Sequence, residues 1–147
     1  MAVLGIGNEL RGDDAAGLYL VRALQPSAAG HDCILVLECG PAPENFSGLL
    51  RRFSPSHVLL VDAALLGAPP GSLCFLEPSQ AGVASSTFTS HALPLSGLAA
   101  YLESELGCTT GILAIQPAQD ELASSLSPAV HRSVRAAART LIKELDV

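Results

Sequence analysis

The architecture of this chain can be read outward from Gly5-Ile6-Gly7-Asn8-Glu9-Leu10-Arg11-Gly12-Asp13-Asp14. A short apolar run precedes this stretch, and an apolar segment with helical spacing follows it. Its glycines allow backbone angles that other residues avoid, which favours a tight strand-to-helix turn. The turn places Asp13 and Asp14 at the start of the first helix. Such carboxylates either cap the helix or belong to a metal or acid–base site at the end of the first strand.

Apolar strands and amphipathic helices alternate along the rest of the chain. Five apolar runs are typical of strands: residues 3–7, 33–37, 58–61, 72–76 and 111–115. Four stretches are typical of helices: residues 14–25, which Pro26 is expected to end, 44–53, 94–106, and a last one that begins at Ser127-Pro128. Residues 38–43 are expected to be a loop, and residues 79–90 a loop or lid.

This order predicts a three-layer α/β/α sandwich, in which a mostly parallel, twisted sheet of about five strands has helices on both faces. The link before strand 72–76 is too short for a helical crossover, so that strand is expected to be antiparallel or at an edge. With 147 residues, the chain is expected to be a single domain over residues 1–147.

The composition is that of a folded protein, because 49% of the residues are hydrophobic and only 15% are charged. The formal net charge is −6, with eight Lys and Arg residues and no basic cluster along the sequence. We therefore expect no nucleic-acid or membrane partner. No apolar run approaches the ~20 residues of a membrane helix. The absence of a leader pattern and of paired cysteine motifs favours a cytoplasmic protein, and the acidic balance suits a monomer.

Three polar residues are expected where ligands bind in open α/β sheets, beyond the carboxyl ends of the strands. Asp14 follows the first strand, Asp62 ends the third, and His91 lies between a polar loop and a helix. Each has an ordinary structural explanation: a helix cap, a turn and an exposed imidazole. Together, two carboxylates and an imidazole suit zinc, nickel or manganese, with a position left open for water or substrate.

Other motifs do not support a different chemistry. Gly5-x-Gly7 begins a dinucleotide-binding fingerprint, but Leu10 stands where its third glycine would be. The sequence has no phosphate-binding loop, no serine nucleophile elbow and no H-E-x-x-H zinc motif. A nucleophile pair of Cys39 and His91 is conceivable, but no local signature supports it.

Five motifs in one order resemble the maturation endopeptidases of nickel–iron hydrogenases, especially the branch that processes hydrogenase 3. They are Gly7-Asn8-x-x-x-Gly12-Asp13-Asp14, Pro41-Ala42-Pro43-Glu44-Asn45, Leu60-Val61-Asp62-Ala63, Ser90-His91-x-x-Pro94-Leu95 and Ile115-Gln116-Pro117. The resemblance implies an aspartic-type endopeptidase that removes the C-terminal extension of the nickel-loaded hydrogenase large-subunit precursor. The precursor would carry the nickel, and zinc or cadmium could replace it in crystals.

The same resemblance implies that Asp14, Asp62 and His91 contact the metal and carry catalysis. Asp13, Asn8 and Gly40 would support them. The chain departs from the family at Ala15 and Cys39, where relatives often have glycine, and Cys39 is expected to narrow the loop beside the site. Two alternatives remain open: a non-catalytic module that binds the metal-loaded precursor, and a stand-alone metallo-hydrolase.

Overall fold

A computed structural model describes residues 1–80, 95–122 and 124–147. Its strands form a single sheet in the order β2-β1-β3-β5-β4. They are β1 (Ala2–Ile6), β2 (Leu35–Gly40), β3 (His57–Ala63), β4 (Leu73–Leu76) and β5 (Thr109–Ile115). Four strands are parallel, and β4 runs antiparallel to β5 at the edge of the sheet. The prediction of a mostly parallel sheet is confirmed, and so is the prediction that the fourth strand is antiparallel or at an edge.

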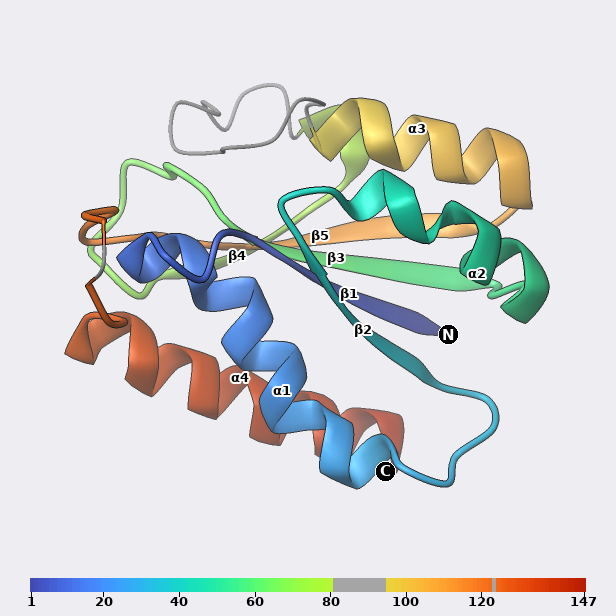
Figure 1. Cartoon of the computed structure of the whole chain (residues 1–147), viewed down its shortest axis with the longest axis horizontal. Coiled ribbons are helices and arrows are strands. Elements are labelled where there is room, and N and C mark those ends of the chain that lie inside the picture. Colours follow the sequence, from blue (N-terminus) through green and yellow to red (C-terminus); the bar gives the residue numbers. More distant parts are fainter. Residues whose placement is uncertain (81–94, 123) are drawn as a thin grey trace.

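Helices cover both faces of this sheet (Figure 1). The helices α1 (Ala16–Ala28) and α4 (Pro128–Leu145) lie side by side on one face, and α2 (Ser47–Phe53) and α3 (Leu95–Leu106) lie on the other. Short 3-10 turns, η1 (Gly12–Ala15), η2 (Pro43–Phe46) and η3 (Pro78–Gln80), lead into or follow these elements. The predicted three-layer α/β/α sandwich is confirmed.

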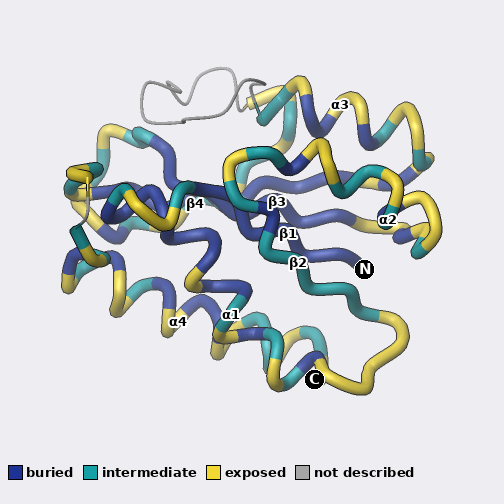
Figure 2. The backbone as a smooth tube through the Cα atoms, viewed as in Figure 1, coloured by how far each residue is buried: buried dark blue, intermediate teal, exposed yellow. Residues whose placement is uncertain are grey.

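The central strands β1, β3 and β5 are mostly buried (Figure 2). Their alternate side chains enter different cores. Leu4 and Leu60 pack with α2 and α3, whereas Val3 and Val61 pack with α1 and α4. Charged side chains cannot enter either core cheaply, which explains why the strands read as continuous apolar runs. None of the helices in the described ranges is long and apolar enough to span a bilayer.

Gly17 sets the position of α1 on the sheet. A Cβ atom here would clash with the backbone carbonyls of Val61 and Ile6, which belong to neighbouring strands. Only glycine allows this close approach of a helix to two strands. The first turn of α1 and the η1 turn before it therefore lie directly over the seam between β1 and β3.

Several predicted element ends were wrong by a few residues. Pro26 does not end the first helix, which continues to Ala28, because a proline in the last turn removes only one helical hydrogen bond. The second strand begins at Leu35 and continues to Gly40, since a bulge at Cys39 keeps it paired with β1 across the expected loop. Asp62 lies within β3, which pairs with β5 as far as Ala63.

The fifth strand also begins earlier than expected, at Thr109. The start of the last helix is confirmed: Ser127 accepts a hydrogen bond from the Val130 amide, and Pro128 follows it as the first helical residue. Of the loop predicted over residues 79–90, only 79 and 80 are described, and they belong to η3. Residues 81–90 lie outside the described part of the chain.

Candidate functional site

Two buried carboxylates stand where the parallel strands β1 and β3 end. Asp14, in η1, is 1% exposed, and Asp62, in β3, is fully buried. Val61 pairs with Gly5 across the two strands, and η1 packs against β3. The structure therefore brings both predicted residues to the carboxyl end of one seam. Burial of two carboxylates is costly unless hydrogen bonds or a cation compensate them.

The turn after β1 is shaped around Asp14. The amide of Asn8 donates a hydrogen bond of 2.9 Å to Asp14 Oδ2. The side chain of Asn8 accepts from the Leu10 amide at 3.0 Å, which fixes the turn. Gly7 has a φ of +136°, and a Cβ atom on it would clash with the carbonyl oxygen of Asp14. Gly7 and Asn8 thus hold the Asp14 carboxylate in place, consistent with the supporting role expected of Asn8.

Asp62 is oriented by the backbone of its own strand, which pairs with β5 at Ala114. Its Oδ1 accepts a hydrogen bond of 2.8 Å from the Ala63 amide. By strand alternation it shares the sheet face of Leu60, on the α2–α3 side. Beyond β5, Gln116 Oε1 accepts from the Leu66 amide at 2.6 Å and so fixes the loop that follows β3. Gln116 stood in a family motif, but the sequence alone gave no reason to assign it this role.

Asp13 faces a different set of partners. Its Oδ2 accepts from the amides of Ala118 at 2.8 Å and Gln119 at 3.2 Å, and its Oδ1 accepts from Ser127 at 2.6 Å. Three backbone donors compensate the burial of this carboxylate. Asp13 therefore anchors the loop between β5 and α4, and it supports Asp14 by fixing the turn that both share.

The third predicted ligand, His91, lies outside the described residues, four positions before α3 begins. Within residues 1–80, 95–122 and 124–147, no group of three or more His, Cys, Asp or Glu residues could hold a metal ion. A site made by Asp14, Asp62 and His91 thus stays a prediction. The two carboxylates supply oxygen donors of the kind that divalent ions accept.

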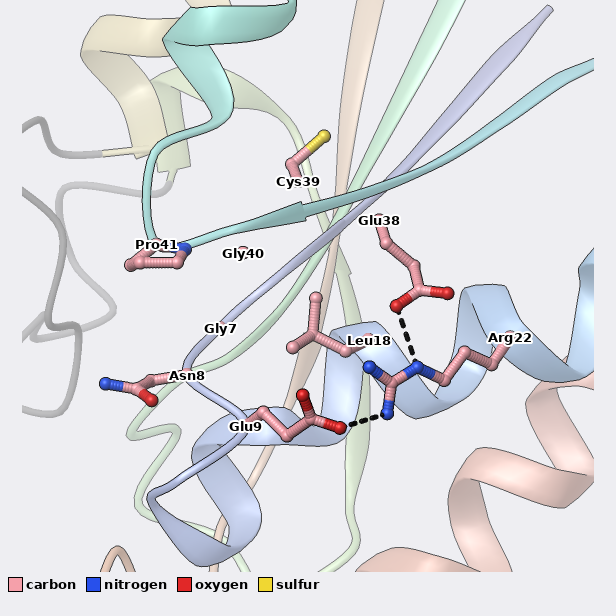
Figure 3. Close-up of a pocket in the computed structure, with 9 residues that line it drawn as sticks. All are labelled: Gly7, Asn8, Glu9, Leu18, Arg22, Glu38, Cys39, Gly40 and Pro41. Carbon is pink, nitrogen blue, oxygen red and sulfur yellow. Dashed lines mark hydrogen bonds and ion pairs between the residues drawn. The ribbon is translucent and has the colours of Figure 1, made fainter.

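A pocket of about 330 Å³ opens beside Asn8, at the ends of β1 and β2 (Figure 3). It is lined by Gly7, Asn8, Glu9, Leu18, Arg22, Glu38, Cys39, Gly40 and Pro41. Gly40 has a φ of +62°, and its carbonyl accepts from the Gly7 amide at 3.2 Å, which ties the two strand ends together. This connection gives the predicted supporting residue Gly40 a structural basis.

Arg22 forms the charged wall of this pocket, as Figure 3 shows. It donates to Glu38 Oε2 and to Glu9 Oε1, both at 2.7 Å, and its guanidinium lies 5.5 Å from the centre of the Tyr19 ring. The hydrogen bond from Arg22 lowers the pKa of Glu9, and the two carboxylates raise the pKa of Arg22. Glu9 and Arg22 are therefore both charged at neutral pH. No sequence pattern indicated this cluster, because its members come from the turn after β1, from α1 and from β2.

Cys39 contributes to the pocket rim, while its side chain packs in the core beside α2 and α3. Burial raises the pKa of its thiol to about 12, so the thiol stays protonated at neutral pH. A nucleophilic cysteine needs a lowered pKa and access to solvent. This environment does not favour the Cys39–His91 nucleophile pair.

Comparisons with known proteins agree with one another. The family model described as hydrogenase maturation protease matches residues 18–144. The hydrogenase 3 maturation protease of Escherichia coli K12 is 32% identical over 115 residues, which cover 78% of this chain and 71% of that protein. The crystal structure of a hydrogenase maturation protease from Thermococcus kodakarensis has a TM-score of 0.87 at 28% identity, covering 99% of this chain and 92% of that one. The solution structure of an E. coli endopeptidase, HycI, has a TM-score of 0.83 at 28% identity, covering 95% and 87%.

Proposed function

The chain belongs to the hydrogenase maturation protease family, and on that premise we propose that it cleaves the C-terminal extension from a nickel-loaded hydrogenase large-subunit precursor. Family membership confirms the resemblance drawn from the five sequence motifs. The observation that supports the activity is the pair of buried carboxylates, Asp14 and Asp62, at the carboxyl end of the β1–β3 seam. The pocket beside Asn8 offers adjoining room for the extended chain of a substrate.

The chemistry required is hydrolysis of one peptide bond. A carboxylate acting as general base accepts a proton from water, the hydroxyl adds to the carbonyl carbon, and the proton passes to the departing amine. Asp14 and Asp62 are the groups that can hold that proton, because both are buried at the carboxyl end of the β1–β3 seam and a backbone hydrogen bond orients each of them. This assignment makes the enzyme an aspartic-type endopeptidase.

The nickel in this scheme belongs to the precursor rather than to the enzyme. Asp14, Asp62 and His91 would supply two carboxylates and one imidazole to the nickel of a docked precursor, a donor set that suits this ion. When the loaded precursor is bound, its metal would polarise the scissile carbonyl or serve only as an anchor that places the bond. Either role makes processing depend on nickel.

The test is to incubate the protein with a large-subunit precursor, with and without nickel, and to measure the product masses. We expect one cut near the C-terminus and only in the nickel-loaded precursor. Asp14→Asn, Asp62→Asn and His91→Ala should each slow the cut by about two orders of magnitude or more. Asp32→Asn makes the same chemical change at an exposed loop residue and should have no effect.

Wild-type rates in all three site variants would refute the assignment of the site. Precursor binding without cleavage by the wild-type protein would instead identify a binding module. Tight nickel or zinc binding by the protein alone, with hydrolysis of small amides, would identify a stand-alone metallo-hydrolase. Circular dichroism of each variant separates loss of chemistry from loss of fold.

A further inference from the structure

Helix α4 carries half of the basic residues of the chain on one solvent-facing side. Arg132, Arg135, Arg139 and Lys143 are all exposed. At 3.6 residues per turn they lie within an arc of about 80° and extend for about 16 Å along the helix. In the sequence they are three or four positions apart, so no basic cluster was evident there. The helix turns that spacing into a continuous basic stripe (Figure 2 shows the exposed side of α4).

The basic stripe has no acidic partner within the described residues. Three of the other basic residues are already paired: Arg11 with Asp120, Arg22 with Glu9 and Glu38, and Arg51 with Glu105. No ion pair of the described chain involves the stripe. The neighbouring helix α1 contains no Asp or Glu, and the only carboxylate within α4 is Glu144, about 120° around the helix from Arg132.

The end of the chain that contains the stripe is positively charged, whereas the rest of the molecule is acidic. Residues 128–147 contain four basic and two acidic residues, a formal charge of +2. Residues 1–127 contain four basic and twelve acidic residues, a formal charge of −8. The molecule therefore presents one basic helix face on a strongly acidic body, an arrangement that orients a charged partner on approach.

We propose that the basic stripe of α4 is the docking surface for an acidic patch on the folded part of the precursor. This inference rests on the proposed function, because it takes the precursor as the partner. Three of the four cations are arginines, whose guanidinium groups pair with carboxylates through two hydrogen bonds. The stripe is only about 16 Å long, so it suits a compact acidic patch. An extended polyanion would reach beyond the stripe and be repelled by the acidic part of the molecule, residues 1–127, with its charge of −8.

The position of the stripe agrees with this role. Ser127, at the start of α4, is hydrogen-bonded to Asp13, which directly precedes Asp14. Arg132 lies about 8 Å further along the helix. A precursor that places its C-terminal segment at the strand ends can therefore rest its folded body on α4. A bilayer is a poorer partner, because the exposed large hydrophobic side chains of the described residues all lie outside this helix.

The test compares steady-state processing of nickel-loaded precursor by three proteins. In the triple variant Arg132→Glu/Arg135→Glu/Arg139→Glu, KM should rise about tenfold or more at low salt, while kcat stays unchanged. The triple Arg→Lys variant keeps the charge and should retain most of the affinity. Added salt should raise the KM of the wild-type protein and hardly change that of the Glu variant.

The two proposals fail in different ways. No cleavage by the wild-type protein would refute the proposed function. Cleavage with an unchanged KM in the Glu variant would overturn the docking surface and leave the protease assignment intact. Arg52→Glu, at an exposed position on α2, controls for a general effect of net charge and should leave KM unchanged. Stripe-dependent binding of duplex DNA or anionic vesicles as tight as that of the precursor would also overturn the docking surface.

Discussion

Asp13 Oδ1 accepts a hydrogen bond of 2.6 Å from the Ser127 amide, although the two residues are 114 positions apart. The same carboxylate accepts two amides of the loop after β5, and Ser127 itself caps α4. One buried side chain thus joins the turn that carries Asp14 to the start of the last helix. The site and the α1–α4 layer are therefore coupled in stability.

Asp13→Ala should destabilise the fold strongly, because it leaves three backbone N–H groups without their acceptor. We expect the free energy of unfolding to fall by about 2–5 kcal/mol in urea titrations. Asp13→Asn keeps one oxygen acceptor and should lose less. Asp32→Ala, at an exposed position, should stay within about 0.5 kcal/mol of the wild-type protein. An Asp13→Ala variant as stable as the wild type would contradict the anchoring role.

Gly17→Ala should also impair folding, for a steric reason. The added methyl group would overlap the carbonyl oxygens of Val61 and Ile6, and neither strand can move without breaking the sheet. The expected cost is about 3 kcal/mol or more, measured by thermal or urea unfolding. Gly48→Ala is the matched control in α2, where nothing lies within 4 Å of the new methyl, and it should stabilise by about 0.5–1 kcal/mol. Equal effects at both positions would show that close packing at Gly17 is not decisive.

Local patterns in the sequence predicted the elements well, because each pattern depends on nearby residues. Ser127-Pro128 marked the start of α4 correctly, since a capping hydroxyl and a fixed proline φ act within one turn. The end of β2 was missed, since its last residues are held by a bulged pairing with β1. Pro26 was misjudged because one lost hydrogen bond does not end a helix that is packed along its length.

The site was predicted only in part, for a related reason. Asp14 and Asp62 could be placed together, because parallel strands end at one edge and both follow or end apolar runs. The cluster of Arg22 with Glu9 and Glu38 depends on the neighbouring positions of β1, β2 and α1. Strand order is a non-local property, and the sequence left it open.

Arg22→Met should impair precursor processing while leaving the free energy of unfolding nearly unchanged. Its side chain is 35% exposed, so loss of the two ion pairs should cost less than about 1 kcal/mol of unfolding free energy. The turn that carries Glu9 and Asn8 loses its link to β2, and precursor processing should fall about tenfold in kcat/KM. Arg52→Met, on the exposed side of α2, should change neither quantity. Full activity in Arg22→Met would show that this wall does not shape the site.

Cys39 should make the protein less stable at alkaline pH. Burial raises the pKa of its thiol from 9.0 to about 12, so the unfolded chain loses this proton before the native state does. As pH rises from 9 towards 12, the native state binds more protons than the unfolded state, and the free energy of unfolding falls by up to about 1.4 kcal/mol per pH unit. Urea titrations across this range should show the fall in the wild-type protein and a shallower one in Cys39→Ala.

At neutral pH a thiol reagent should modify the exposed Cys33 at once and Cys39 only on unfolding. Parallel pH profiles for the two proteins, or rapid labelling of Cys39 in the native state, would contradict the buried, protonated thiol.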